Sequence, residues 1–283
     1  MKTKELGKNP QRMSRRRLPL GRWLLLVIVA ALLLHGWSQG AKIDPANLLV
    51  GLGRLVDFLV DAFPPDLDRL GAITLSLLVT FEMALLGTII GALFSLPLAW
   101  AAARNTSPHP IVYGLARGYI SVCRTIPDMV WGLLFVIAVG LGPQAGVLAL
   151  AVDTMGFCGR FFAEAIEEVD PGPAQALEAN GASRLAVLLG GIVPNAMPSF
   201  IATSMFSLEQ ATRSSVVLGL VGAGGIGIEL SVSMSLLRYD EAMTIILCIF
   251  VVVLIVERIS AALRRAVLDD NERIPAELRG VAA

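Results

Sequence analysis

Long runs of apolar residues are the feature that most restricts the fold of this chain. Hydrophobic residues make up 55% of its 283 residues and charged residues only 16%, whereas a soluble domain carries about a quarter charged residues. A run of about 20 apolar residues spans the roughly 30 Å core of a bilayer, because each helical residue adds about 1.5 Å. The sequence therefore predicts an all-α, polytopic bundle of transmembrane helices.

Six apolar runs are long enough to cross a membrane as helices. Arg15, Arg16 and Arg17 precede the first run, and Arg264 and Arg265 follow the last, so the positive-inside rule places both termini in the cytoplasm. Because further runs follow it, we interpret the first run as an uncleaved helix and not as a removed signal peptide. The runs cover about 18–39, 73–102, 113–141 (interrupted at 124–128), 144–162, 196–220 and 243–263.

These runs divide the chain into five segments. A basic cytoplasmic N-terminus precedes the first transmembrane helix. An acidic, extracytoplasmic segment follows, and its leucines recur at helical spacing, which predicts an amphipathic helix on the outer membrane surface. A transmembrane core with a long cytoplasmic loop and a cytoplasmic tail complete the chain. The segments are 1–17, 18–39, 40–70, 71–265 with the loop at about 163–194, and 266–283.

The distribution of reactive and basic residues excludes several classes of function. A P-loop needs a lysine directly after its glycine-rich turn, but every lysine of this chain lies near the N-terminus. We therefore expect no ATP site of that kind, and no cofactor, in this chain. The scattered cysteines and histidines predict neither a metal site nor a thiol–imidazole pair. A net charge of zero gives no support to nucleic-acid binding. These residues are Lys2, Lys4, Lys8, Lys42, Cys123, Cys158, Cys248, His35 and His109.

The cytoplasmic loop at 163–194 has the pattern of folded structure. The stretch from Asp170 to Pro173 is expected to stop the preceding helix, and Pro173 also suits the first turn of a new one. The next residues favour a short helix that ends at Gly181, and Ser183 and Pro194 are suited to begin the helices that follow. A helix of about seven residues is marginal alone in water. It therefore packs against the rest of this chain or against a separate protein, unless the segment is an ordinary interhelical loop.

This loop resembles the EAA loop of binding-protein-dependent ABC importer permeases. That pattern reads Glu-Ala-Ala, three residues, Gly, nine residues and Ile-x-Leu-Pro. Gly181 and Pro194 stand at the family spacing, and the chain departs from the pattern at Gln175, Leu177, Gly191 and Val193. Stretches similar to the phosphonate-type branch lie at 124–128, 140–143, 162–173 and 217–227, so the resemblance covers roughly residues 45–265.

The resemblance implies the permease subunit of an ATP-driven importer in the bacterial inner membrane, for phosphonate or a related phosphorus oxyanion such as phosphate or phosphite. It implies a second copy of this chain, two ATP-binding cassette ATPase subunits that hold ATP and Mg, an extracytoplasmic binding protein and surrounding membrane lipid. The short helix would sit in a cleft of the ATPase and convert its closure into movement of the spans. The implied coupling residues are Gln175, Ala176, Leu177, Glu178, Ala179, Gly181 and Pro194.

A glycine-rich stretch links the fifth and sixth apolar runs. It formally contains G-x-G-x-x-G, but a dinucleotide site needs a preceding strand, and here an apolar span precedes the glycines. In membranes, glycines let helices approach closely or bend. We therefore expect a hinge or a gate near the outer end of the pathway, built on Gly222, Gly224, Gly225 and Gly227.

Six charged residues lie within or beside the apolar runs, where a charge is costly unless it is paired or lines a cavity. Two hypotheses remain open for them. In one they are buried structural pairs, as the four-residue spacing of Glu209 and Arg213 suggests. In the other, Arg124 or Arg213 faces the pathway and contacts a phosphorus oxyanion, whose geometry a guanidinium matches. The six are Glu82, Arg124, Asp128, Asp153, Glu209 and Arg213.

Two other classes of function fit the sequence less well. A secondary transporter for a small anion, driven by an ion gradient, often has inverted repeats and paired broken helices, whereas one break, at 124–128, stands out here. A membrane enzyme needs a nucleophile–base set or a metal cluster, and we find no such pattern in the sequence. The resemblance places selectivity mostly in the binding protein, so phosphonate, phosphate and phosphite are not separated by this chain.

Overall fold

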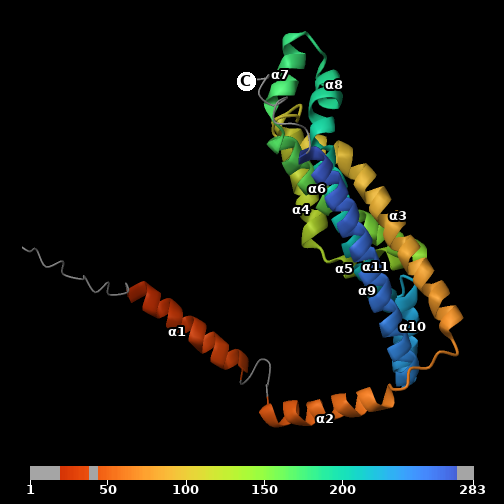
Figure 1. Cartoon of the computed structure of the whole chain (residues 1–283). Helices are drawn as coiled ribbons and strands as arrows, with labels where there is room; N and C mark the ends of the chain where they lie inside the picture. Colours follow the sequence, from red (N-terminus) through yellow and green to blue (C-terminus); the bar gives the residue numbers. More distant parts are fainter. Residues whose placement is uncertain (1–19, 38–43, 273–283) are drawn as a thin grey trace, which may run out of the picture. The chain divides into compact units, whose positions relative to one another are not determined.

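The computed structural model describes residues 20–37 and 44–272, and every regular element among them is a helix. The predicted N-terminal segment 1–17 and the last residues of the predicted tail lie outside the described residues. The chain divides into two units, Met1–Val60 and Asp61–Ala283, which are described separately. The second unit forms the helical bundle (Figure 1).

The first unit contains two helices, α1 (Leu20–His35) and most of α2 (Pro45–Asp61). The described length of α1 is 16 residues, or about 24 Å at 1.5 Å per residue, which is shorter than a bilayer core. Residues 18–19 and 38–39 of the predicted span lie outside the described residues. Asp44 caps α2, because its carboxylate accepts a hydrogen bond from the Ala46 backbone N–H at 2.9 Å. The predicted amphipathic helix is therefore formed; its place on a membrane surface stays a prediction.

Four continuous helical segments of the second unit are long and apolar enough to cross a membrane: Leu70–Ala102, Pro143–Glu168, Arg184–Leu220 and Tyr239–Val267. They correspond to the second, fourth, fifth and sixth predicted spans. The first two are α3 (Leu70–Ala102) and α6 (Pro143–Glu168), which pack closely through glycines of α3. A Cβ on Gly91 would lie 2.6 Å from the Ala151 carbonyl oxygen, so a larger residue would separate the two helices.

The predicted third span is not straight. It consists of α4 (Pro110–Thr125) and α5 (Asp128–Val139), whose axes differ by 92°. Pro127 causes the turn, because it has no backbone N–H to continue the helix and it forces the preceding Ile126 into an extended conformation, with φ −85° and ψ 121°. If this bent pair counts as one span, the described residues contain up to five candidate spans.

The two ends of the bundle carry short helices. At one end, here called the α7 end, lie α7 (Pro171–Ala179) and α8 (Arg184–Val187) (Figure 1). A π-helical turn, Leu188–Ile192, joins α8 to α9 (Val193–Leu220). At the opposite end, here called the α10 end, α10 (Ile226–Ser235) lies beside the start of α11 (Tyr239–Glu272).

Three clusters of buried side chains hold the bundle together along its length. Phe162 and Phe200 belong to the cluster toward the α7 end, and their ring centroids are 4.5 Å apart. Leu150 and Leu218 belong to the middle cluster, and Ile245 to the cluster toward the α10 end. Burial of these apolar side chains and close helix packing fix the positions of the polar residues described below.

Candidate functional site

The short helix α7 begins earlier than the sequence pattern predicts. The stretch from Asp170 to Pro173 follows the end of the preceding helix, as expected, since α6 ends at Glu168; α7 then starts at Pro171, two residues before Pro173. Asp170 is its N-cap, and its carboxylate accepts a hydrogen bond from the Gly172 backbone N–H at 2.9 Å. Prolines are tolerated in a first helical turn, since the N–H that they lack has no intrahelical partner there. The same residues therefore end α6 and open α7.

The end of α7 has the predicted left-handed glycine. Gly181 has a φ of +75°. Its N–H donates to the Glu178 carbonyl at 2.9 Å, and the Ala182 N–H donates to the Leu177 carbonyl at 3.1 Å. This pair of bonds is a Schellman motif, which satisfies the last carbonyls of a helix. Both ends of a marginal nine-residue helix are thus capped.

One face of α7 rests on the π-helical turn before α9. A Cβ on Gly191 would lie 3.1 Å from the Ala174 Cα and 3.3 Å from the Leu177 Cδ1. Gly191 is one of the positions where the chain departs from the EAA pattern, and the sequence did not identify it as part of the site. The other face, with Gln175, Ala176, Glu178 and Ala179, is exposed.

The helix after α7 is longer than predicted. Ser183 caps α8, as expected, and its hydroxyl accepts a hydrogen bond from the Ala186 N–H at 3.3 Å. The fifth span was predicted to start near residue 196, but the apolar helix runs without a break over Arg184–Leu220. Pro194 lies in the first turn of α9, and the π-helical turn before it keeps the helix continuous. α7 is therefore joined to a membrane-spanning helix by a short turn and continuous helix.

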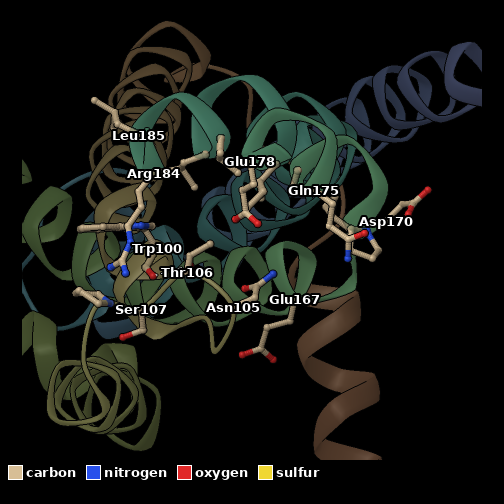
Figure 2. A pocket seen from close by; sticks show the side chains of 17 residues that line it. Trp100, Asn105, Thr106, Ser107, Glu167, Asp170, Gln175, Glu178, Arg184 and Leu185 are labelled. Carbon is tan, nitrogen blue, oxygen red and sulfur yellow. Dashed lines mark hydrogen bonds between the residues drawn. The ribbon is translucent and has the colours of Figure 1, made fainter. Parts of the chain in front are cut away.

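A groove of about 880 Å³ lies between α7, α8 and the connection from α3 to α4 (Figure 2). At its base, the Glu167 carboxylate accepts hydrogen bonds from the Arg104 backbone N–H at 2.8 Å and from the Arg117 guanidinium at 2.9 Å. The Arg104 guanidinium donates to the Tyr113 hydroxyl, which raises the pKa of Arg104 above its usual value. Glu167 thus ties the end of α6 to the chain that follows α3 and to the middle of α4.

The glycine-rich stretch is a tight joint between helices. The Ile226 N–H donates to the Thr80 hydroxyl of α3 at 2.7 Å, and the Gly142 N–H donates to the Gly222 carbonyl at 3.1 Å. Gly222, Gly224 and Gly225 all have positive φ, and a Cβ on Gly224 would lie 2.8 Å from the Pro143 nitrogen. A helix precedes the stretch, so it lacks the strand of a dinucleotide site.

Three of the six predicted intramembrane charges come together at the bend of the third span. Arg124 and Asp128 flank Pro127, and both interact electrostatically with Asp153 of α6. The Arg124 guanidinium carbon lies 5.9 Å from the ring centroid of Phe157. Glu82 of α3 stands apart: it is exposed, and we find no hydrogen bond or ion pair to it among the described residues.

The remaining two predicted charges form the expected pair and gain a third member. Arg213 lies 3.3 Å from one carboxylate oxygen of Glu209, and Arg264 of α11 lies 3.3 Å from the other. The Glu209 side chain is 10% exposed, whereas Arg213 is 45% exposed. Glu209 therefore joins α9 to α11, and Arg213 keeps part of its guanidinium free for other contacts.

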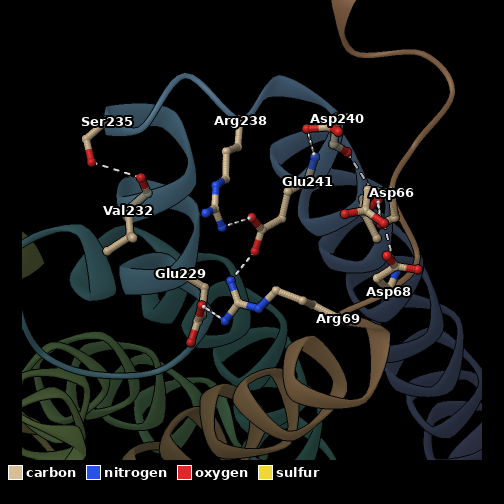
Figure 3. Close-up of polar contacts among 10 residues, drawn as sticks. Asp66, Asp68, Arg69, Glu229, Val232, Ser235, Arg238, Asp240 and Glu241 are labelled. Atoms are coloured by element: carbon tan, nitrogen blue, oxygen red, sulfur yellow. Dashed lines mark hydrogen bonds and ion pairs between the residues drawn. The ribbon is translucent and has the colours of Figure 1, made fainter.

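A polar network at the α10 end was not predicted from the sequence. The Arg69 guanidinium pairs with Glu241 of α11 and, at 3.2 Å, with Glu229 of α10 (Figure 3). The Glu241 carboxylate, followed by that of Glu229, raises the pKa of Arg69 above its usual value. The Thr244 hydroxyl donates to the Asp66 carbonyl at 2.6 Å. The network connects the chain entering α3 to α10 and α11.

Comparison with known proteins identifies the family. The family model described as "Binding-protein-dependent transport system inner membrane component" matches residues 95–269. The chain belongs to this family of permeases. The match covers α7, the glycine-rich stretch and all the predicted intramembrane charges except Glu82.

Two relatives indicate the branch of the permease family. Over 250 residues, the permease is 40% identical to "Phosphite transport system permease protein PtxC" of Stutzerimonas stutzeri, covering 87% of this chain and 90% of the relative. Over 231 residues it is 42% identical to "Phosphate-import permease protein PhnE" of Mycolicibacterium smegmatis, covering 82% of this chain and 43% of that one. The resemblance to phosphonate-type permeases is confirmed.

The solved structures confirm the fold class. An inward-facing structure of the MetNI methionine ABC transporter covers 71% of this chain and 99% of its own chain, with a TM-score of 0.62 and 19% identity. At that identity the likeness concerns the fold alone. The permease is thus a multi-pass inner-membrane protein with a type I ABC importer permease fold, a translocating subunit and not an enzyme. Membership of the family favours an importer permease over an ion-driven secondary transporter.

Proposed function

We propose that this permease carries a phosphorus oxyanion (phosphonate, phosphate or phosphite) into the cell. The names of its relatives support this class of substrate, since they contain phosphite and phosphate. The working complex would hold a second copy of the chain, two ATPase subunits that bind ATP and Mg, and an extracytoplasmic binding protein. In this arrangement the α7 end faces the cytoplasm and the α10 end faces outward.

The observation that carries the coupling role is the state of α7. It has no buried residue, yet it is capped at both ends and rests on Gly191. A helix of this length is marginal without further packing. We infer that its exposed face, with Gln175, Ala176, Glu178 and Ala179, docks into the ATPase, and that Gly181 and Pro194 transmit the movement to α9.

The intramembrane charges support a pathway through the bundle. Charged side chains in membrane helices face a cavity or pair with one another. Glu82 and the exposed part of Arg213 therefore face the second copy or the pathway, whereas Glu209 is structural. Arg124, Asp128 and Asp153 would line the pathway at the bend. The glycine joint (Gly222, Gly224, Gly225 and Gly227) would act as a hinge or gate.

The remaining segments follow from this orientation. Residues 1–17 and 266–283 would be cytoplasmic, 18–39 would form the first transmembrane helix, and α2 within 40–70 would lie on the outer membrane surface. The permease core would be 71–265, with the coupling loop at about 163–194.

Reconstitution tests the proposed function. The permease is placed in proteoliposomes with its cognate ATPase and binding protein. Uptake of labelled phosphite, phosphate and methylphosphonate is then measured with and without ATP enclosed in the vesicle lumen, where the ATPase lies. We expect ATP-dependent uptake of at least one of these ions and none of sulfate. Uptake driven by an ion gradient without ATP would instead support a secondary transporter.

A further inference from the structure

Three arginines from two helices surround a second cavity, of about 360 Å³. Arg117 and Arg124 come from α4, and Arg160 comes from α6. The other lining residues are Ile120, Ser121 and Thr125, so every charge that lines this cavity is positive. We call it the arginine cavity. The sequence identified Arg124 but gave no reason to group it with Arg117 and Arg160.

The arginine cavity exists because of helix periodicity and small residues. Arg117, Ser121 and Arg124 recur at spacings of four and three, so they share one face of α4. Two glycines of α6 let that face approach closely. A Cβ on Gly156 would lie 3.2 Å from the Arg124 Cγ, and a Cβ on Gly159 would lie 3.4 Å from Ile120 side-chain atoms. Larger residues at these glycines would force α4 and α6 apart.

The three guanidiniums differ in how many hydrogen bonds and ion pairs they already make within the protein. Arg117 donates to Glu167 and, at 2.7 Å, to the Ala102 carbonyl. Arg160 pairs with Glu164 at 2.8 Å on the same helix. Arg124 has neither a hydrogen bond nor an ion pair within residues 20–37 and 44–272, and it stacks against Phe157 and Phe161 instead. Donors are therefore left over, above all on Arg124.

Arg124 lies far along α4 from the α7 end of the bundle, so its free donors are not at that end. It lies about 21 Å along α4 from Pro110, at about 1.5 Å per residue. Asp128 and Asp153 act electrostatically near this point, but neither lines the cavity. A cluster of guanidiniums and hydroxyls at this depth matches a tetrahedral oxyanion, since guanidinium forks donate pairs of hydrogen bonds to its oxygens.

We propose that the arginine cavity is a binding site for a phosphorus oxyanion on its way to the cytoplasm, with Arg124 and Arg160 as ligands. The proposal rests on the transport function proposed above and adds a site within the chain to it. Arg117 also contacts Glu167, which lines the groove beside α7. The same chemistry describes the phosphate of a lipid headgroup, and the depth of Arg124 favours the transported ion.

Binding is tested on the full chain in phosphatidylcholine nanodiscs, by the ³¹P line broadening of added phosphite. Phosphite is the probe because its resonance differs from that of the lipid phosphates. We expect the wild-type chain to broaden the line. Arg124→Gln should weaken binding about tenfold, because a charge-assisted contact is lost. Arg124→Lys should retain part of the binding, since it keeps the charge without the fork.

Two further variants keep the test sharp. Arg160→Gln changes an exposed side chain and should weaken binding several-fold without disturbing the fold. Arg265→Gln is the matched control, because Arg265 donates to the Ala261 carbonyl of its own helix and lies outside the cavity; binding should be unchanged. Equal broadening by the wild type and Arg124→Gln, or no broadening by the wild type, would overturn the proposal.

Two arms separate the sources of the oxyanion. In nanodiscs of phosphatidylglycerol, phosphite binding should persist; its loss there would assign the cavity to a headgroup and overturn the pathway site. In the ATP-driven uptake assay, Arg124→Gln and Arg160→Gln should both lower phosphite uptake several-fold. Normal uptake by both variants would refute the arginine cavity alone, whereas no uptake by the wild-type complex would refute the proposed function.

Discussion

At the scale of single residues, glycines determine how α7 is held. Gly181 ends the helix with a positive φ, and Gly191 leaves room for Ala174 and Leu177. The role of Gly181 could be predicted, because a glycine after a short run of helix formers is a local signal. The role of Gly191 could not, because it depends on which helix packs above it.

Replacing Gly181 with valine should uncouple the permease from its ATPase. A left-handed backbone costs about 1–2 kcal/mol for a residue with a Cβ, and a β-branched residue fits it poorly, so the Schellman bonds should be lost. We expect normal membrane insertion but several-fold lower substrate-stimulated ATP hydrolysis. Gly181→Asn is the control, because asparagine tolerates this conformation, and it should keep most of the stimulation. Equal stimulation by wild type and Gly181→Val would show that the cap is dispensable.

Glu209 is a carboxylate that pairs with two arginines from different helices, Arg213 of α9 and Arg264 of α11. Glu209→Gln should lower the free energy of unfolding by about 1–3 kcal/mol, because hydrogen bonds to a charged group are lost in a poorly solvated place. Denaturation in mixed micelles measures the effect. Glu164→Gln, which breaks an exposed pair four residues apart on one helix, should change stability far less. A loss of similar size in both variants would contradict the joining role of Glu209.

At the scale of elements, the structure changed the third span and the start of the fifth. The interruption at 124–128 was visible in the sequence, but the 92° angle between α4 and α5 was not. A proline predicts where a helix stops, whereas the direction of the next helix depends on what it packs against. The continuous helix Arg184–Leu220 was missed for a related reason: Pro194 looked like a start, and the π-helical turn hid the continuation.

The contact between α7 and the π-helical turn gives an element-scale prediction. Gly191→Val should push α7 away, because its Cβ would already lie 3.1–3.2 Å from the Ala174 backbone. We expect a several-fold drop in stimulated ATP hydrolysis, with co-purification of the ATPase weakened. Gly190→Val is the matched control: its nearest neighbour is the flexible Leu177 Cδ1 at 3.4 Å, so coupling should be largely kept. A larger loss of stimulation in Gly190→Val than in Gly191→Val would contradict the proposed contact between α7 and the π-helical turn.

At the scale of the whole molecule, the open question is whether Arg213 has a structural role or contacts the transported ion. Arg213→Gln leaves the Glu209–Arg264 pair between α9 and α11, so the fold should survive. We expect lower uptake of phosphite by the reconstituted complex, with ATPase binding intact. Unchanged uptake would assign Arg213 a structural role only.

The sequence by itself determined the membrane class, the places of the second, fourth and sixth spans, the break in the third span and the glycine cap of α7 at Gly181. These depend on composition, apolar run length and local capping, which are read within a few neighbouring residues. The tertiary structure decided which charges meet: Arg264 with Glu209, Asp153 with Arg124 and Asp128, and Arg160 with Arg117 and Arg124. Those groupings join residues far apart in the chain, and they depend on helix angles and on glycine contacts that no local pattern encodes.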